Sequence, residues 1–386
     1  MSPGLCTPIS AQQPRVALAH DWLTGMRGGE RTLEAICELF PTATCFSLIH
    51  APGSVSPTIE ATRIRTSFIQ KLPLSRHYYR PLLPLFPTAV EQFDLDDFDL
   101  IISTSHCVVK SIVVPGRTRH LCYCFTPMRY AWDQFEAYFG ADRVGPLGTR
   151  LFRRGLSAMA RWDASTAYRP DRYVAISQYV ARRIQRYYNR VAGVIYPPVD
   201  TNFFQPGREP LESYCLVVSA LVPYKCVDLA IRACALTGMP LRIVGDGPDL
   251  PRLKAISGAD VAFLGSVSDE QVRLMYQRAV AVLLPGTEDF GIAPVEAQAC
   301  GRPVVALKAG GACETVIDEA TGILVAEATD IAFADAIDRV RRMRFDKSAI
   351  RAHAIRYSRE RFQTAMQREV VRLMASPRCE PPNDAA

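Results

Sequence analysis

The segment from residue 279 to residue 306 constrains the fold of this chain more than any other. Its first part, AVAVLLPG, predicts a buried strand that ends in a turn, and VEAQAC after Pro294 predicts the first turns of a helix, where proline is well tolerated. Phe290-Gly291-Ile292 lies between them, and its glycine lets a ligand come close to the backbone. Because the unpaired amides at a helix start attract phosphate, this strand–loop–helix unit predicts a phosphate-binding site.

Two glutamates, Glu288 and Glu296, flank this loop at a spacing of eight positions. A carboxylate does not bind phosphate, but it accepts hydrogen bonds from sugar hydroxyls. Phosphate-binding amides between two such carboxylates predict a site for a nucleotide sugar. The alternative is a plain strand–loop–helix unit with two surface glutamates.

The chain of 386 residues is too long for one typical core and predicts two domains. Apolar, β-rich segments alternate with helical segments in two successive series, which begin at RVALAHDW and at YCLVVSALV. This alternation predicts an α/β fold with two doubly wound, Rossmann-like domains. We place the first domain at 14–200, the second at 201–375, a linker at about 197–212, and disordered tails at 1–13 and 376–386.

Composition excludes several classes of protein. With 48% hydrophobic and 22% charged residues and no run of 18 uncharged apolar residues, the chain matches a soluble globular protein without a transmembrane helix. Its first residues lack the charged start and apolar stretch of a signal peptide. Most of the twelve cysteines stand singly in apolar runs, which predicts buried free thiols in a reducing cytoplasm. The net charge of +6 comes without a nucleic-acid motif, so it favours an anionic membrane surface over nucleic acid as a partner.

The E-x7-E pattern of Glu288 and Glu296 resembles that of retaining family 4 glycosyltransferases, whose GT-B fold has two Rossmann-like domains facing across a cleft. The resemblance covers roughly residues 14–375, and VSALVPYKCVDLAI is similar to a second family segment, GRLVPxKGxD. Three other segments are most similar to bacterial O-antigen and exopolysaccharide mannosyltransferases: HDWLTGMRGGER, CYCFTPMRYAWD and RWDASTAYRPDRYVAIS. In similar proteins the last helix, here within SRERFQTAMQREVVRLMA, often crosses back to the first domain.

The resemblance implies a role for each matching residue. Lys225 matches the lysine that contacts the donor diphosphate, which an ammonium group can do as a point charge. Glu288 is expected to hold the hydroxyls of the transferred sugar, and Glu296 those of the ribose. The other donor-binding residues that it implies are Gly28 and Gly29 after the first strand, Gly245 and Gly247 in a turn near the nucleotide, Val267 beside the base, and Phe290, Gly291 and Ile292.

Two positions depart from the family pattern. Ala220 replaces an arginine that grips the diphosphate, and Phe125 replaces a histidine of the cleft. A charged hydrogen bond contributes about 1.5–3 kcal/mol, so its loss weakens donor binding unless another arginine compensates. Arg129 is the candidate for this catalytic role, and the alternative is a structural ion pair with Asp133, four residues on. Ser177, which we place with Phe125 on the acceptor side of the cleft, is equally well explained as a helix cap.

Residues 67–86 have two interpretations of equal weight. Lys71, Arg76 and Arg80 are interspersed there with aromatic and aliphatic side chains, a mixture that suits an anionic membrane surface. The alternative is a loop and helix that pack on the first domain. An Asp-x-Asp pattern in DLDDFDL, at 94–100, holds a divalent metal in glycosyltransferases of another fold. No suitable partners accompany it here, so we interpret it as a solvated turn and expect neither a metal nor a cofactor.

The resemblance implies a metal-independent, retaining hexosyltransferase. Its expected donor is a nucleotide sugar, with GDP-mannose the first candidate, and its expected acceptor is a lipid-linked glycan of bacterial surface polysaccharide or lipopolysaccharide synthesis. The protein is expected in the cytoplasm, with peripheral contact at the inner face of the membrane. The alternative is a non-catalytic or altered GT-B subunit that binds nucleotide sugar in a polysaccharide assembly complex, supported by Phe125 and Ala220. A nucleotide-sugar epimerase of similar architecture is a third hypothesis, which the E-x7-E pattern disfavours.

Overall fold

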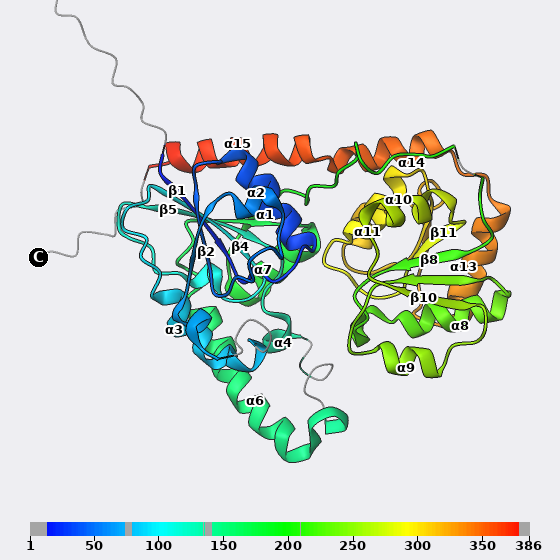
Figure 1. The fold of residues 1–386 in the computed structure, drawn as a ribbon, viewed down its shortest axis with the longest axis horizontal. Coiled ribbons are helices and arrows are strands. Elements are labelled where there is room, and N and C mark those ends of the chain that lie inside the picture. Colours follow the sequence, from blue (N-terminus) through cyan, green and yellow to red (C-terminus); the bar gives the residue numbers. More distant parts are fainter. Residues whose placement is uncertain (1–13, 74–78, 134, 136–140, 209, 378–386) are drawn as a thin grey trace, which may run out of the picture.

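The computed structural model describes residues 14–377, except 74–78, 134, 136–140 and 209. It contains two parallel β-sheets, each with its own helices, that lie side by side (Figure 1). This arrangement confirms the predicted α/β fold with two Rossmann-like domains, the GT-B architecture. The predicted tails lie outside the described residues, except for Ser376 and Pro377.

The first domain is built on a sheet of seven strands in the order β3-β2-β1-β4-β5-β6-β7. Its central strands are buried along their length, as is typical of a parallel sheet covered on both faces. Its strands are β1 (Val16–His20), β2 (Thr44–Ser47), β3 (Arg63–Thr66), β4 (Leu100–Ser105), β5 (Arg119–Cys124), β6 (Arg172–Ala175) and β7 (Ala192–Val194). Its α-helices are α1 (Gly28–Leu39), α2 (Pro57–Glu60), α3 (Phe86–Glu91), α4 (Arg129–Trp132), α6 (Ala141–Ser165) and α7 (Gln178–Tyr188). Among the described residues of this domain, the 3-10 helices are η1 (Phe68–Lys71), η2 (Arg80–Leu85) and η3 (Val109–Ser111).

The second domain is built on a sheet of six strands in the order β10-β9-β8-β11-β12-β13. The strands are β8 (Cys215–Val218), β9 (Leu241–Val244), β10 (Val261–Gly265), β11 (Ala281–Leu284), β12 (Val304–Leu307) and β13 (Gly322–Val325). The helices are η4 (Pro223–Lys225), α8 (Val227–Thr237), α9 (Leu250–Ala255), α10 (Asp269–Arg278), α11 (Ile292–Ala299), α12 (Ala312–Thr315), α13 (Asp330–Arg342), α14 (Lys347–Ala354), η5 (Ile355–Tyr357) and α15 (Arg359–Ala375).

Each sheet has one point at which the order of its strands reverses. In the first sheet this point lies between β1 and β4, and in the second between β8 and β11. In parallel α/β sheets, ligands bind in the crevice outside the carboxyl ends of the strands at such a point. The loops that leave β1, β4, β8 and β11 are therefore the places where this fold positions a site.

The last helix, α15, belongs in sequence to the second domain but packs on the first, where it runs along the outer side of the sheet (Figure 1). Phe362 is 2% exposed, and its ring meets that of Tyr123 of β5 edge-on, with 5.6 Å between the centroids. At the start of the helix, Arg359 forms an ion pair of 2.8 Å with Glu38 of α1. The helix thus ties the two domains together, partly through its apolar face and partly through its charges.

Several apolar side chains of residues 67–86 pack inside the first domain. Ile69, Tyr79 and Phe86 are buried in its core, and Leu82 and Leu83 pack against that core. Arg76, and the side chain of Arg80, lie outside the part of the chain that is described. This packing favours the second of the two interpretations for the apolar residues, and contact with an anionic membrane stays a prediction. Among the described residues, no helix is long and apolar enough to cross a membrane.

We expect Phe362→Ala to lower the free energy of unfolding of the first domain by about 3–5 kcal/mol, because truncation of a buried phenylalanine leaves a cavity between α15 and β5. All three tryptophans of the chain, Trp22, Trp132 and Trp162, lie in the first domain. Urea denaturation followed by tryptophan fluorescence therefore measures this change directly.

The matched control for this prediction is Val371→Ala, a truncation at a position of α15 that is 67% exposed. We expect it to change stability by no more than about 0.5 kcal/mol. Equal denaturation midpoints for the two variants would show that α15 does not stabilise the first domain.

Candidate functional site

The loop between β11 and α11 carries the residues on which the sequence analysis rests most. Gly291 adopts a left-handed conformation, with a φ of 89°, and caps α11. The helix begins at Ile292, three residues before the start predicted after Pro294. Pro294 is tolerated in the first turn because its missing amide would have no partner there in any case. In the part of the chain described, no side chain caps this helix start, so its first amides are available to a ligand.

Lys225 and Glu288 form an ion pair. Lys225 lies in η4, after β8, and Glu288 follows β11, the strand next to β8. The fold therefore brings together two residues that were predicted from separate segments. Both side chains are largely buried, with 15% and 13% exposed, and both lie at the point where the strand order of the second sheet reverses.

Arg129 reaches this pair from the first domain. Its Nε donates a hydrogen bond of 3.0 Å to Asp289, and its guanidinium carbon lies 4.9 Å from the ring centroid of Tyr224. The Lys225 ammonium lies 5.2 Å from the centroid of the same ring, so both cations lie beside Tyr224. Burial opposes the charged form of Arg129, but Asp289, Tyr224 and Glu288 outweigh it and raise the pKa of its guanidinium.

The alternative pairing of Arg129 with Asp133 is not what the structure shows. Asp133 caps the end of α4, where its amide donates a hydrogen bond of 3.0 Å to the carbonyl of Arg129, but its side chain does not pair with the Arg129 guanidinium. Instead, Asp133 forms an ion pair of 2.7 Å with Arg183 of α7.

Arg183 and Asp289 are functional candidates that the sequence analysis missed. Arg183 donates hydrogen bonds of 2.9 Å to Asp289 and 2.6 Å to Thr126, so Asp289 lies between two arginines of the first domain. A signal for Arg183 does exist, since it occupies the buried face of α7 together with Val180, Ile184 and Tyr188. A charged residue at an apolar position of an amphipathic helix calls for a buried partner.

Ser177 caps α7, since its hydroxyl accepts a hydrogen bond of 3.0 Å from the amide of Val180. It also donates one of 2.6 Å to the carbonyl of Asp289, across the domain interface. Glu314, a residue that the sequence analysis did not single out, accepts the amides of Gln178 and Tyr179 at 2.8 and 3.0 Å. The start of α7 is thus bound by two residues of the second domain.

Glu296 is buried in α11, where the hydroxyl of Tyr276 donates a hydrogen bond of 3.1 Å to it. Burial raises the pKa of its carboxyl to about 7, although the positive charge of Arg31 opposes this. Arg31, on α1 of the first domain, binds both carboxylate oxygens of Asp269 at 2.7 Å. An ion pair between the domains therefore lies close to the predicted ribose-binding residue.

Gly28 and Gly29 lie where the two domains meet. A Cβ atom at Gly28 would be 2.6 Å from the Cδ1 atom of Ile292, at the start of α11. A Cβ atom at Gly29 would be 3.5 Å from the ring of Phe125. The two segments predicted to contact the donor, one from each domain, are therefore adjacent in space.

Other predicted donor-binding residues serve the packing of the protein itself. A Cβ atom at Gly245 or Gly247 would lie 1.9 Å or 2.3 Å from a backbone oxygen of the loop after β8, so their turn needs glycine whether or not a nucleotide is bound. Phe290 is 2% exposed and stacks on Tyr196, with 5.7 Å between the ring centroids. Val267 is partly buried against the larger hydrophobic core.

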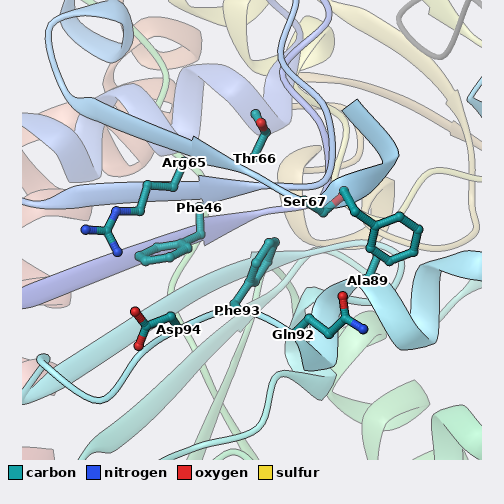
Figure 2. A pocket seen from close by; sticks show the side chains of 9 residues that line it. Phe46, Arg65, Thr66, Ser67, Ala89, Gln92, Phe93 and Asp94 are labelled. Atoms are coloured by element: carbon teal, nitrogen blue, oxygen red, sulfur yellow. The ribbon is translucent and has the colours of Figure 1, made fainter. Parts of the chain in front are cut away.

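A separate cavity of about 210 Å³ lies in the first domain, between the end of β3 and α3 (Figure 2). Its lining consists of Phe46, Arg65, Thr66, Ser67, Phe68, Ala89, Gln92, Phe93 and Asp94, as far as the described residues go. None of these is a predicted site residue, so the cavity is distinct from the candidate site.

The described residues contain no group of three or more histidine, cysteine, aspartate or glutamate side chains that could hold a metal ion. Residues 94–97 form a loop and turn. The cysteines that the structure describes carry free thiols, most of them buried. The absence of a metal requirement stays a prediction.

Comparison with known proteins supports a glycosyltransferase. Residues 199–361 match the family of glycosyl transferases group 1. A D-inositol 3-phosphate glycosyltransferase of Mycobacterium leprae is 33% identical over 172 residues, which are 39% of this chain and 40% of that protein. The chain thus matches about 40% of the length of such curated relatives. The match to the family lies mainly on the second domain.

Solved structures share the fold over almost the whole chain. Anabaena HepE in complex with UDP-glucose superposes with a TM-score of 0.71 at 19% identity, over 92% of this chain and 99% of that one. The lipopolysaccharide outer core galactosyltransferase WaaB does so with a TM-score of 0.64 at 16% identity, over 93% and 99%. At these identities the likeness establishes the GT-B fold, whereas the sequence match of the second domain supports group 1 glycosyltransferase activity.

We expect the wild-type protein to lose stability as the pH rises from 4.5 to about 7, and we expect Glu296→Gln to abolish this loss. Unfolded Glu296 releases its proton near the ordinary pKa of 4.5, whereas the folded protein keeps it until a pKa of about 7. Rising pH therefore favours unfolding of the wild type, by up to about 3 kcal/mol, whereas the glutamine of the variant does not titrate and adds no such dependence.

Thermal denaturation of both proteins at pH 5 and pH 8 measures this effect. The variant should gain in melting temperature relative to the wild type at the higher pH. Glu270→Gln, at an exposed position of α10, is the matched control. A difference between Glu296→Gln and the wild type that stays constant with pH would contradict the assignment.

Proposed function

We propose that this protein is a retaining, metal-independent glycosyltransferase that moves a hexose from a nucleotide sugar to a lipid-linked glycan. The observation that carries the proposal is the meeting of Lys225, Glu288 and Arg129 beside the start of α11. Two cations and a carboxylate suit the two halves of such a donor, because cations bind its diphosphate and the carboxylate accepts hydrogen bonds from its sugar.

The charge that grows on the leaving diphosphate needs stabilisation in the transition state. Lys225 and the amides at the start of α11 supply it from the second domain. Arg129 supplies it from the first domain, where it takes over the role of the arginine that Ala220 replaces. Its Nη1 is buried and has no hydrogen-bond partner among the residues that the structure describes, so a phosphate oxygen would satisfy an otherwise unpaired donor.

The proposed roles of the glutamates follow from their surroundings. Glu288 exchanges its ion pair with Lys225 for the hydroxyls of the sugar, while Lys225 turns to the diphosphate. Glu296 lies one helical turn further into α11 and binds the ribose. Its raised pKa, about 7, leaves it close to half protonated at neutral pH, so it can both donate to and accept from a hydroxyl.

The identity of the donor rests on similarity alone. The segments that resemble O-antigen mannosyltransferases make GDP-mannose the first candidate, and the UDP-glucose complex of HepE makes UDP-glucose its rival. We place the acceptor on a lipid at the inner face of the membrane, in bacterial surface polysaccharide synthesis, a setting supported by the fold shared with WaaB. Lys71 is exposed on the first domain and is available for contact with anionic lipids.

A second candidate function is donor binding without transfer, in a polysaccharide assembly complex. Phe125 favours it, because a phenyl ring in the cleft can pack against a sugar but cannot exchange a proton with it. Donor binding together with release of sugar would exclude this candidate, and binding without any release would favour it.

We expect Lys225→Ala to weaken the binding of GDP or UDP about 10- to 100-fold, because it removes a charged hydrogen bond to the diphosphate. Isothermal titration calorimetry with each nucleotide measures the change. Lys254→Ala, at an exposed position of α9, is the matched control and should bind as the wild type does.

Ala220→Arg tests the same site in the opposite direction. Ala220 is exposed in the loop two residues after β8, so a guanidinium group has room there and should tighten binding of the same nucleotide. If Lys225→Ala binds the preferred nucleotide as tightly as the wild type does, the phosphates of that nucleotide do not contact Lys225.

A further inference from the structure

Two of the segments that resemble mannosyltransferases are joined by a hydrogen bond that the proposed function leaves unused. Trp132, in CYCFTPMRYAWD, is the last residue of α4, and Asp163, in RWDASTAYRPDRYVAIS, lies near the end of α6. The indole Nε1 of Trp132 donates a hydrogen bond of 2.7 Å to Oδ2 of Asp163. This bond joins α4 to α6 where the two helices lie against each other (Figure 1).

Asp163 is held in place as a charged acceptor. It is fully buried, and its Oδ1 forms an ion pair of 3.0 Å with Lys110, which is itself 1% exposed. The Lys110 ammonium also donates a hydrogen bond of 2.7 Å to the carbonyl of Asp163. The hydroxyl of Tyr188, at the end of α7, donates one of 2.9 Å to Oδ2. Because a shift of this carboxylate would leave a buried charge uncompensated, Asp163 is a fixed point for the indole of Trp132.

Helix α4 needs such an anchor, because a single turn of helix has no stability of its own. It spans only Arg129–Trp132. Its last residue is held twice, by Asp163 and by the ring of Tyr187, which stacks on the indole with 4.7 Å between the ring centroids. Its first residue is Arg129, whose guanidinium reaches Asp289 in the second domain. The place of Arg129 in the crevice therefore depends on what holds Trp132.

The same indole lies beside the helix that supplies the second arginine of the site. Tyr187, on which Trp132 stacks, is four residues after Arg183 on α7, and its ring centroid is 5.9 Å from the Arg183 guanidinium carbon. Arg183 and Arg129 bind the same carboxylate, that of Asp289. The contacts of Trp132 thus set the two arginine-bearing elements, α4 and α7, relative to each other.

We propose that Asp163 is a positioning residue: through the indole of Trp132 it holds α4 so that Arg129 is ordered for the second phosphate before the donor binds. This inference rests on the proposed function, in which Arg129 binds the diphosphate. Neither Asp163 nor Trp132 needs to contact the donor for this effect. A side chain that is ordered in advance loses less entropy when it binds, and this contributes about 2- to 10-fold in affinity.

The test variant is Trp132→Phe, which removes the indole N–H but keeps a ring that can stack on Tyr187. Trp132 is only partly buried, so the smaller ring should be tolerated. Dissociation constants for GDP and GMP, and for UDP and UMP, are measured by isothermal titration calorimetry. We expect the variant to lose about 2- to 10-fold of the preference for the diphosphate, with the affinity for the monophosphate unchanged. An equal loss of affinity for both nucleotides would overturn the inference, because a general structural effect does not single out the second phosphate.

A double variant shows whether the indole acts through Arg129. If it does, adding Trp132→Phe to Arg129→Gln should lower the preference for the diphosphate no further, because the side chain that the indole positions is already gone. The same loss in both backgrounds would show that the indole acts independently of Arg129, which would overturn the inference.

The matched control is Trp162→Phe. Trp162 directly precedes Asp163, and its indole Nε1 also donates to a carboxylate, that of Glu91 in α3, at 3.3 Å. The control therefore removes the same kind of hydrogen bond within the first domain, but one that holds α3 instead of α4. It should keep the wild-type preference for the diphosphate, and a loss equal to that of Trp132→Phe would overturn the inference.

The outcomes separate this inference from the function on which it rests. If the wild type binds none of the nucleotides, the proposed function is wrong and the inference falls with it. If Arg129→Gln keeps the wild-type preference, the phosphate-binding role of Arg129 is wrong, and so is its positioning by Asp163. If Arg129→Gln loses the preference but Trp132→Phe keeps it, the proposed function stands and only the positioning role of Asp163 is wrong.

Discussion

The carboxylate of Asp289 lies between two guanidinium groups, those of Arg129 and Arg183, and this contact spans the crevice between the domains. The aspartate comes from the second domain and both arginines from the first. Buried ion pairs add little net stability, but removal of one partner leaves an uncompensated charge at a cost of about 3–5 kcal/mol. The arrangement therefore specifies how the domains meet more than it stabilises either of them.

The geometry of the candidate site depends on this contact. Asp289 directly follows Glu288, so holding its carboxylate also fixes the loop that carries the predicted sugar-binding residue. Arg129 is held over Tyr224 by the same bond, within reach of the pair formed by Lys225 and Glu288. Ser177 and Glu314 add hydrogen bonds across the same interface, and α15 ties the domains together at the far side. The site is thus shared by two domains, and neither contains all of it.

Sequence alone was sufficient for the parts of the fold that depend on local patterns. Apolar runs bounded by glycine and proline located the strands, and the rule that parallel strands end at one edge places Lys225 and Glu288 near each other. What could not be predicted depends on how the domains are oriented. Arg183 and Asp289 are 106 residues apart in different domains, and no local pattern pairs them.

Two differences between the interpretations drawn from the sequence and the structure have local causes. The alternative pairing of Arg129 with Asp133 assumed helical spacing, but Asp133 leaves helical geometry at the end of α4 and pairs with Arg183, while Arg129 pairs with Asp289. The membrane interpretation of residues 67–86 rested on exposed aromatic and aliphatic side chains, and several of these are buried in the first domain. In both cases the residue types were informative, but their surroundings were not visible in the sequence.

The central claim is that Arg129, from the first domain, binds the second phosphate of a donor held mainly by the second domain. The most direct test compares the affinities for GDP and GMP, and for UDP and UMP, in the wild type and in Arg129→Gln. The account predicts that the wild type prefers the diphosphate and that the variant loses about 10- to 100-fold of that preference while its affinity for the monophosphate is unchanged. An equal preference in both proteins would contradict the account, because Arg129 would then serve only to hold the domains together.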